Sequence, residues 1–371
     1  MSHRKNLEGT IDTVHPHTIK KFELIEAYVK TWAQKLLNFG PCNGIAFIDC
    51  MSNRGVYRDD SGREVFGTPI RVSNYISEIM KTYPQKQAWL YFNDLSPEKI
   101  ETLRTYLPPE TGNFHITTRS GDGNELLKEI NISSHPQVNY LLVYDPYQAS
   151  VDWEALMPFL RNWGEVIINH MVSDPIRGIS QAKRDSTVVK YEQTYLASIQ
   201  ELATFGSNRE SYEKRVEEIM IALRGTSSKR YYIASFPFFN TNNTLVYNLI
   251  HGSSNIEGFK LFKKTAWKIF GGKSSIKDTH GNEQQLMFDM SSKGKVTTFT
   301  DEYCYYVKDI AKYLYNLFTG KSDVPLKKVW SALDEHPVFP SEGYANEIKN
   351  ILKNDYNCKI SRTSITFTNR R

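Results

Sequence analysis

The chain has 371 residues, of which 40% are apolar and 13% aromatic, enough to bury one large hydrophobic core or two unequal ones. Its net charge of +5 is compatible with a polyanionic partner but does not require one, and its four scattered cysteines argue against a disulfide framework, a zinc site and metal catalysis. No signal peptide or membrane-spanning apolar run is evident, which together with the cysteine usage predicts a protein of the reducing cytoplasm.

The first half of the chain alternates amphipathic and apolar segments. Residues 18–37 carry apolar side chains at alternating three- and four-residue spacing, which predicts a helix, and the apolar run 44–49 predicts the first strand. Thr68-Pro69 is typical of a helix start, with a polar N-cap residue before a proline. This alternation predicts a doubly wound, mostly parallel α/β sheet. Further strands are expected over 88–93, 113–118, 139–144 and 165–169, and helices over 96–107, 125–130 and 153–162.

The segment that follows separates the alternative α/β folds. After a helical insertion over about 175–223 come two aromatic, β-branched runs, 230–238 and 244–250, so close in sequence that they predict an antiparallel hairpin. A Rossmann-like parallel sheet that ends in such a hairpin is typical of class I methyltransferases. Dinucleotide dehydrogenases lack this ending, and residues 44–55 also lack the G-x-G-x-x-G fingerprint of those enzymes.

The pattern changes at about residue 300. Helices are predicted over 303–318, 326–335 and 341–354, and short strands over 358–360 and 364–368. Three helices followed by a two-stranded wing is the order of a winged helix-turn-helix domain. The sequence therefore predicts two domains, a methyltransferase-like α/β domain over 1–295 and a winged helix over 300–371.

Two of the predicted strands end on an aspartate. Asp49 follows the first strand, and Asp145 follows the fourth, in the tripeptide Asp145-Pro146-Tyr147. Because ligands of open parallel sheets bind just beyond the carboxyl ends of the strands, both acids are predicted to line a nucleotide-type pocket. The tripeptide is similar to the corner with which some methyltransferases bind the amino group of an extruded base, with the aromatic residue stacked on that base. Ordinary strand-ending turns are the alternative for both positions.

Other polar residues are expected at the same edge. Asp94 follows the second strand, where an acid binds ribose hydroxyls in such pockets, although a helix start nearby is the alternative. Asp122 lies between two glycines and is placed either to accept the adenine amino group or to form an ordinary turn. Asn169 and His170 end the fifth strand, and a structural role is expected for the histidine.

Two regions are candidates for contact with nucleic acid. The stretch 257–277 carries six lysines against one acid, interleaved with aromatic residues that suit backbone contact and base stacking. An amphipathic helix that packs its aromatic residues inward is the alternative. In the carboxy-terminal domain, 341–354 would be the recognition helix, with a modest charge for that role. The candidate contacts are Lys260, Lys263, Lys264, Trp267, Lys268, Lys349, Lys353 and Arg362.

Five stretches of the chain share the pattern of one family: residues 17–25, residues 47–57, Gly67-Thr68-Pro69, and the strand ends 145–147 and 165–169. On these stretches, and over most of residues 15–290, the chain resembles the three-Cys-motif partner (TcmP) family, methyltransferase-like proteins of bacteria and archaea. In that family the stretches correspond to the lead helix, the D-x-F-A-G-x-G loop, the G-S-P helix start and the ends of two strands. The three-Cys label describes the partner protein, so no cysteine motif is expected in this chain. A winged helix is often appended in this group.

The resemblance implies methyl transfer from S-adenosylmethionine to an amino nitrogen of a nucleic-acid base. It also implies nucleic acid and a three-Cys-motif partner protein as binding partners, in the context of bacterial defence systems or mobile elements. The residues assigned to the substrate are Asp145, Pro146 and Tyr147, and those assigned to the cofactor are Asp49, Gly55, Asp94 and Asp122.

The loop after the first strand departs from the family pattern. Residues 51–54, Met-Ser-Asn-Arg, replace the glycines that let the backbone approach a ligand, and of these only Gly55 remains. The charge of Arg54 would oppose a sulfonium 4–6 Å away by about 1 kcal/mol or more, unless the side chain turns outward or pairs with Asp49. The alternative function is therefore a catalytically degenerate methyltransferase fold that acts as a nucleic-acid or nucleotide sensor or as a partner protein. A transcription regulator with a ligand-sensing α/β domain is a third.

Overall fold

The computed structural model describes residues 12–130, 137–146, 148–162, 164–179, 185–225, 230–277 and 304–369. Tyr147 lies outside these ranges, and so does the predicted boundary between the two domains. None of the described helices has the length and apolar character needed to cross a membrane.

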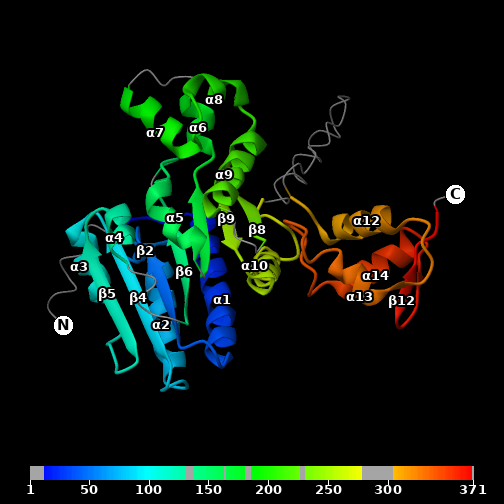
Figure 1. The fold of residues 1–371 in the computed structure, drawn as a ribbon, viewed down its shortest axis with the longest axis horizontal. Coiled ribbons are helices and arrows are strands. Elements are labelled where there is room, and N and C mark those ends of the chain that lie inside the picture. The colour runs from blue at the N-terminus through cyan, green and yellow to red at the C-terminus, as the bar shows by residue number, and fades with distance from the viewer. Residues whose placement is uncertain are drawn as a thin grey trace.

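Within the described residues, a seven-stranded sheet forms the centre of the larger part of the molecule (Figure 1). Its spatial order is β5-β4-β1-β6-β7-β9-β8, and all neighbours pair in parallel except β9, which runs antiparallel to both β7 and β8. Counted along the chain, this order is 3-2-1-4-5-7-6, which is the class I methyltransferase topology and confirms the predicted fold class. The bounds are β1 Gly44–Asp49, β4 Gln87–Asp94, β5 Phe114–Ser120, β6 Val138–Tyr144, β7 Gly164–His170, β8 Tyr232–Phe239 and β9 Leu245–Ser253.

Helices cover both faces of the sheet because its central strands are apolar on both sides. In β1, Ile45 and Phe47 pack into one core, whereas Ile48 packs into the other. The first core includes α1, α2, α3 and α10, and the second includes α4, α5, α7, α8 and α9. Their bounds are α1 Pro16–Asn38, α2 Thr68–Met80, α3 Pro97–Arg104, α4 Gly123–Glu129, α5 Trp153–Arg161, α7 Asp185–Tyr195, α8 Ile199–Phe205, α9 Arg209–Arg224 and α10 Ile256–Ile269.

Two features of this part bear on the candidate site. A hairpin that the sequence did not predict, β2 (Val56–Arg58) with β3 (Glu64–Phe66), follows the loop after β1. The predicted helical insertion consists of α6 (Ser173–Gly178) with α7, α8 and α9. Because α6 begins soon after β7 ends, this layer lies at the carboxyl ends of the strands (Figure 1).

The carboxy-terminal part contains helices and short strands close to the predicted positions. Among its described residues, β10, β12 and β11 form an antiparallel sheet in that order. Strand β10 was not predicted, because two residues give no periodicity. The bounds are α12 Val307–Phe318, β10 Val324–Pro325, α13 Leu326–Ser331, α14 Ala345–Asn354, β11 Lys359–Ile360 and β12 Ser364–Thr366.

Helix α10 joins this part to the main sheet (Figure 1). The side chain of Lys263 is fully buried, and its Nζ donates to the backbone oxygens of Leu333 (2.9 Å), Asp334 (3.0 Å) and His336 (2.6 Å). The indole of Trp267 is also buried and donates to another backbone oxygen of the same segment (2.9 Å). Neither side chain has surface left for nucleic acid, so the structure corrects that expectation for Lys263 and Trp267 and favours the inward-packing alternative.

The remaining lysines of α10 lie around this interface. Lys264 pairs with Glu342 (2.7 Å), and Lys260 lies 3.6 Å from a carboxylate oxygen of Asp334. Lys268 is exposed. Part of the positive charge that suggested a nucleic-acid surface is therefore used to attach the carboxy-terminal part to the sheet.

Candidate ligand site at the carboxyl ends of the strands

Asp49 and Asp145 lie at the same edge of the sheet. Strands β1 and β6 are parallel neighbours, with Asp49 opposite Val143, so Asp145 follows two residues beyond that position. The strand order reverses at this pair, because β4 and β5 extend from β1 on one side and β7 extends from β6 on the other. Ligands of open α/β sheets bind at such a switch point, outside the carboxyl ends of the strands.

The carboxyl group of Asp49 is buried, with 4% of the residue exposed. Burial raises the pKa of Asp49, and the negative charge of Asp145 raises it further, to about 7. A hydrogen bond from the backbone N–H of Met51 (3.3 Å) and the charge of Lys21 oppose this change. Asp49 therefore exchanges a proton near neutral pH, and a cationic ligand beside it would favour its charged form.

Asp145 is held from two sides. The ammonium of Lys21 lies 2.5 Å from Oδ2, and the side-chain amide of Asn169 donates to Oδ1 (2.5 Å). Lys21 comes from the first turns of α1, and Asn169 from the end of β7. Pro146 is buried, and Tyr147 lies outside the described residues, so its stacking role stays a prediction. These contacts fix the direction of the carboxylate.

The sequence analysis did not identify Lys21 as a site residue, although its position in the helix pattern indicates that it is buried. Leu24 and Tyr28 follow it at three and seven residues, so Lys21 lies on the apolar face of α1 and is itself buried. A lysine on the buried face of a helix needs a partner. Periodicity alone does not identify that partner, which comes from a strand end far away in the sequence.

The loop after β1 is fastened to the neighbouring strand ends. The backbone N–H of Ser52 donates to the oxygen of Asn93 (2.7 Å), and that of Asn53 donates to Asp94 Oδ2 (3.1 Å). The amide of Asn93 donates to backbone oxygens in the loops after β1 (3.0 Å) and after β5 (2.9 Å). Asn93, which the sequence did not single out, thus ties strand β4 to the loops after β1 and β5.

Asn53 and Gly55 give this loop its shape, with φ values of 57° and 70°. Asparagine and glycine are the residues that adopt this left-handed region most readily. A Cβ atom at Gly55 would lie 2.7 Å from Cδ1 of Leu103, so this glycine permits close packing of the loop on α3. Asp94 accepts from the backbone of Asn53 and also from that of Ser96 (2.9 Å). It therefore holds backbone at the rim of the site and beside the start of α3, as the helix-start alternative predicts, while its contact with ribose stays a prediction.

Asp122 caps the amino terminus of α4. Its carboxylate accepts from the backbone N–H groups of Asn124 (2.7 Å) and Glu125 (3.3 Å), and the residue is exposed. A Cβ atom at Gly123 would lie 2.6 Å from the backbone oxygen of Cys50, so α4 begins directly against the loop after β1. The structure gives Asp122 a capping role at the correct edge of the sheet.

Arg54 neither points outward nor pairs with Asp49. The residue is 7% exposed, and its Nε lies 3.8 Å from a carboxylate oxygen of Asp12, whose side chain is 55% exposed. The negative charges of this region also act on the hydroxyl group of Tyr57. Burial raises the pKa of Tyr57, and the charges of Asp49 and other acids raise it further.

The helical insertion fixes the segment that follows Asp145. Asp174, in α6, accepts from the backbone N–H of Ala149 (2.9 Å) and pairs with Lys190 of α7 (3.1 Å). Thr194 donates to the oxygen of Ala149 (3.0 Å) and accepts at its own backbone oxygen from the indole of Trp153 (2.7 Å). The insertion therefore supports the loop after β6, which begins at Asp145.

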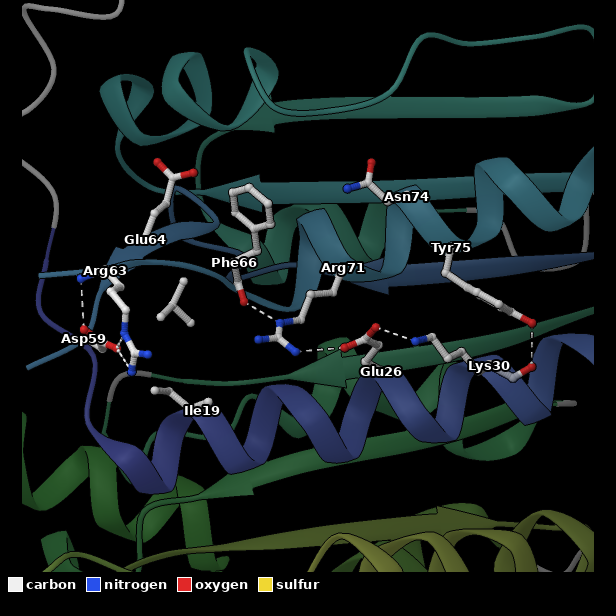
Figure 2. A pocket seen from close by; sticks show the side chains of 11 residues that line it. Ile19, Glu26, Lys30, Asp59, Arg63, Glu64, Phe66, Arg71, Asn74 and Tyr75 are labelled. Carbon is white, nitrogen blue, oxygen red and sulfur yellow. Dashed lines mark hydrogen bonds and ion pairs between the residues drawn. The ribbon is translucent and has the colours of Figure 1, made fainter. Parts of the chain in front are cut away.

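A cavity of about 790 Å³ lies elsewhere, between α1, α2 and the β2–β3 hairpin (Figure 2). Its charged side chains pair with one another rather than face an empty centre. Glu26 binds both Arg71 (2.9 Å) and Lys30 (2.6 Å), and Arg63 binds Asp59 (2.8 Å). With Glu64 included, three acids balance three bases in the lining, so the cavity has no net charge to select a ligand and the strand-end cluster remains the stronger candidate site.

No protein-family model and no curated protein matches the chain. Among solved structures, similarity is found to LPL1258 from Legionella pneumophila, of family DUF519, with 13% identity over 69% of this chain and 94% of that chain and a TM-score of 0.40. An O-methyltransferase from Bacillus cereus in complex with SAH has 10% identity over 65% and 82% of the two chains and a TM-score of 0.32. Loganic acid methyltransferase with SAH has 11% identity over 69% and 83%, with a TM-score of 0.29.

At these scores the similarities add no weight to the assignment, which depends on the strand order. That order and the acids at its switch point define the chain as a protein of the class I methyltransferase fold.

Proposed function

We propose that the chain is a methyltransferase that uses S-adenosylmethionine to methylate an amino nitrogen of a nucleic-acid base. The observation that supports this most is the fixed carboxylate of Asp145, held by Lys21 and Asn169 beside the buried Asp49. Methyl transfer to an amino group depends on the orientation of the nitrogen more than on a strong acid or base. The proposal includes membership of the TcmP family, with its three-Cys-motif partner and its defence or mobile-element context.

The residues at this edge fit S-adenosylmethionine. Asp49 and Asp94 supply carboxylate oxygens, which suit the ammonium, sulfonium and ribose hydroxyl groups of that molecule. The amide oxygen of Asn93 is buried and has no hydrogen-bond partner in the described part of the chain. Buried polar groups of this kind call for a ligand or a water molecule. When bound, the cofactor would supply an electrophilic methyl group.

Asp145 would orient the substrate. Its carboxylate would accept a hydrogen bond from the target amino group and so direct the nitrogen lone pair. Overall, an N–C bond forms while a C–S bond breaks, and the nitrogen releases one proton. Lys21 and Asn169 keep the acceptor in place, and the α6–α7 layer supports the loop that would carry Tyr147 against the base.

The carboxy-terminal part would contact the polymer. Its order of helices and strands is that of a winged helix, in which α14 would be the recognition helix and the β11–β12 hairpin the wing. Lys353 on α14 and Arg362 on the wing are exposed, while Lys349 lies over the ring of Trp330 (5.9 Å). Exposed cations on both elements suit phosphate contacts.

Ligand-dependent unfolding and methyl transfer test this proposal together. S-adenosylhomocysteine at a hundredfold over its Kd should add about 2.7 kcal/mol to the free energy of unfolding, a shift of several degrees in Tm. Methyl transfer from labelled S-adenosylmethionine to DNA and RNA should then fall at least about a hundredfold in Asp145→Asn, which keeps the size of the side chain but changes its charge. Binding of ATP without binding of either sulfur ligand would refute the proposal, and equal transfer by both proteins would remove the role of Asp145.

A second candidate is a degenerate methyltransferase fold that binds nucleotide or nucleic acid without turnover. It is favoured by the ion pair that already engages Asp145 and by the arginine at position 54, where the family has small residues. The distinguishing result is stoichiometric binding of a sulfur ligand with no methyl transfer to any nucleic acid, with Asp145→Asn leaving that binding unchanged.

A further inference from the structure

Arg54 is a buried cation whose donors lack an acceptor. Its Nε and Nη1 atoms are buried and make no hydrogen bond to any residue that the structure describes. The contact with Asp12, at 3.8 Å, is too long for a hydrogen bond, and the carboxylate of Asp12 is largely solvated. Burial of an unbonded charge is costly, so an arginine kept in this state calls for a partner.

Arg54 belongs to the loop that forms the rim of the strand-end site, and its side chain is buried there. Its neighbours Asn53 and Gly55 both have left-handed φ values, which turn the chain sharply on either side of it. The same loop is tied to Asp94 through the N–H of Asn53 and to Asp49 through that of Met51. Arg54 thus directly follows the segment 51–53, which contacts both acids assigned to the cofactor.

The surrounding charge limits which anion Arg54 can take. Asp145 already pairs with Lys21 and Asp94 lies 3.9 Å from Lys99, which leaves Asp49 and Arg54 as the groups of opposite charge that a ligand would meet. A zwitterion with one carboxylate and two cationic groups matches the site, because its cations meet the acids and its carboxylate meets the guanidinium. The amino-acid end of S-adenosylmethionine has this charge pattern.

We propose that Arg54 binds the carboxylate of the cofactor and so selects the intact amino-acid end. The inference rests on the proposed function and reverses the expectation from sequence that this arginine would oppose the sulfonium. A guanidinium and a carboxylate form a strong, directional pair. In this arrangement Arg54 compensates for the glycines that the loop lacks, since a side chain replaces backbone N–H groups as the donor.

Two ligands that differ only in the carboxylate test the inference. S-adenosylhomocysteine and its decarboxylated analogue, S-adenosyl-3-thiopropylamine, would be titrated calorimetrically into the full chain. The unmodified protein should bind S-adenosylhomocysteine about ten- to a hundredfold more tightly, the range expected for charge-assisted hydrogen bonds. In Arg54→Gln this preference should disappear through weaker binding of S-adenosylhomocysteine alone, and Arg54→Lys should restore part of it.

Arg58→Gln is the matched control, because Arg58 follows on β2 and donates to the oxygen of Gly62 (3.2 Å) within the hairpin. The Arg58→Gln variant should keep the full preference for S-adenosylhomocysteine over the decarboxylated analogue. Equal binding of both ligands by the unmodified protein, or an equal loss of both in Arg54→Gln, overturns the inference and leaves the proposed function standing. If neither ligand binds, both the inference and the proposed function are overturned. Tight binding of ATP would assign Arg54 to a phosphate instead.

Discussion

Asp49→Asn should make the protein more stable above about pH 7, although it removes a charge from the candidate site. Burial and Asp145 raise the pKa of Asp49 to about 7 in the folded protein, whereas an aspartate in an unfolded chain has a pKa of about 4. Between these values the folded state holds a proton that the unfolded state has released. The free energy of unfolding therefore falls as the pH rises from about 4 to 7. A difference of about three pK units corresponds to about 4 kcal/mol, an upper limit because nearby groups relax.

Urea unfolding at pH 4.5, 6 and 8 measures this effect. The unmodified protein should lose stability across the series, whereas Asp49→Asn should lose much less and be the more stable protein at pH 8. Asp122→Asn is the control, because that exposed residue caps a helix and asparagine caps equally well. Its pH dependence should follow the unmodified protein. Parallel pH profiles for Asp49→Asn and the unmodified protein would refute the argument that this carboxyl group is protonated by burial.

Three further predictions concern individual cations. Lys21→Met should lower kcat for methyl transfer about ten- to a hundredfold through loss of the orientation of the substrate acceptor, with a much smaller change in the Kd of S-adenosylhomocysteine, since Lys21 acts on Asp49 only through its charge. Lys20→Met, at a half-exposed position beside it, should change neither, and equal effects of the two would contradict this role. Lys263→Met should speed amide hydrogen exchange at least about tenfold in the segment after α13, because each buried carbonyl left without a donor costs about 1–3 kcal/mol. Lys264→Met should not, and unchanged exchange in both variants would show that the buried ammonium does not hold this interface. Arg362→Gln should reduce the slope of log affinity against log salt by about one if it contacts a phosphate, whereas an unchanged slope would indicate that the wing does not touch the nucleic-acid backbone.

The main sheet could be predicted from sequence because its strands are long and apolar on both faces. The run 44–49 coincides with β1, and the antiparallel ending followed from two aromatic runs separated by a short loop. The β2–β3 hairpin could not be predicted in this way. Strands of three residues show no periodicity, and this hairpin depends on a turn in which Asp59 accepts from the backbone of Ser61 (2.9 Å) and Arg63 (3.0 Å).

The sequence predicted the part of the candidate site that depends on strand ends. It missed the part that depends on packing between distant segments. Asp49 and Asp145 follow from the rule that strands of a parallel sheet end at one edge. Lys21 does not, because a helix pattern shows which face is buried but not what covers it. The same limit explains the assignment of Lys263 and Trp267 to nucleic acid, since sequence does not reveal that α10 is covered on its second side by the carboxy-terminal part.

The position of α10 between the main sheet and the carboxy-terminal part has a geometric consequence for the proposed function. A nucleic-acid-binding domain on a flexible tether can reach many positions. Under the proposed function, a domain joined to the sheet through α10 would instead keep a constant distance and angle from the methyl-transfer site. If α14 binds a nucleic acid, the nucleotide presented to Asp145 lies a fixed number of nucleotides along the strand from the site that α14 binds. The distance between α14 and Asp145 would then determine which nucleotide is methylated, and lengthening or shortening α10 by one turn would change that nucleotide.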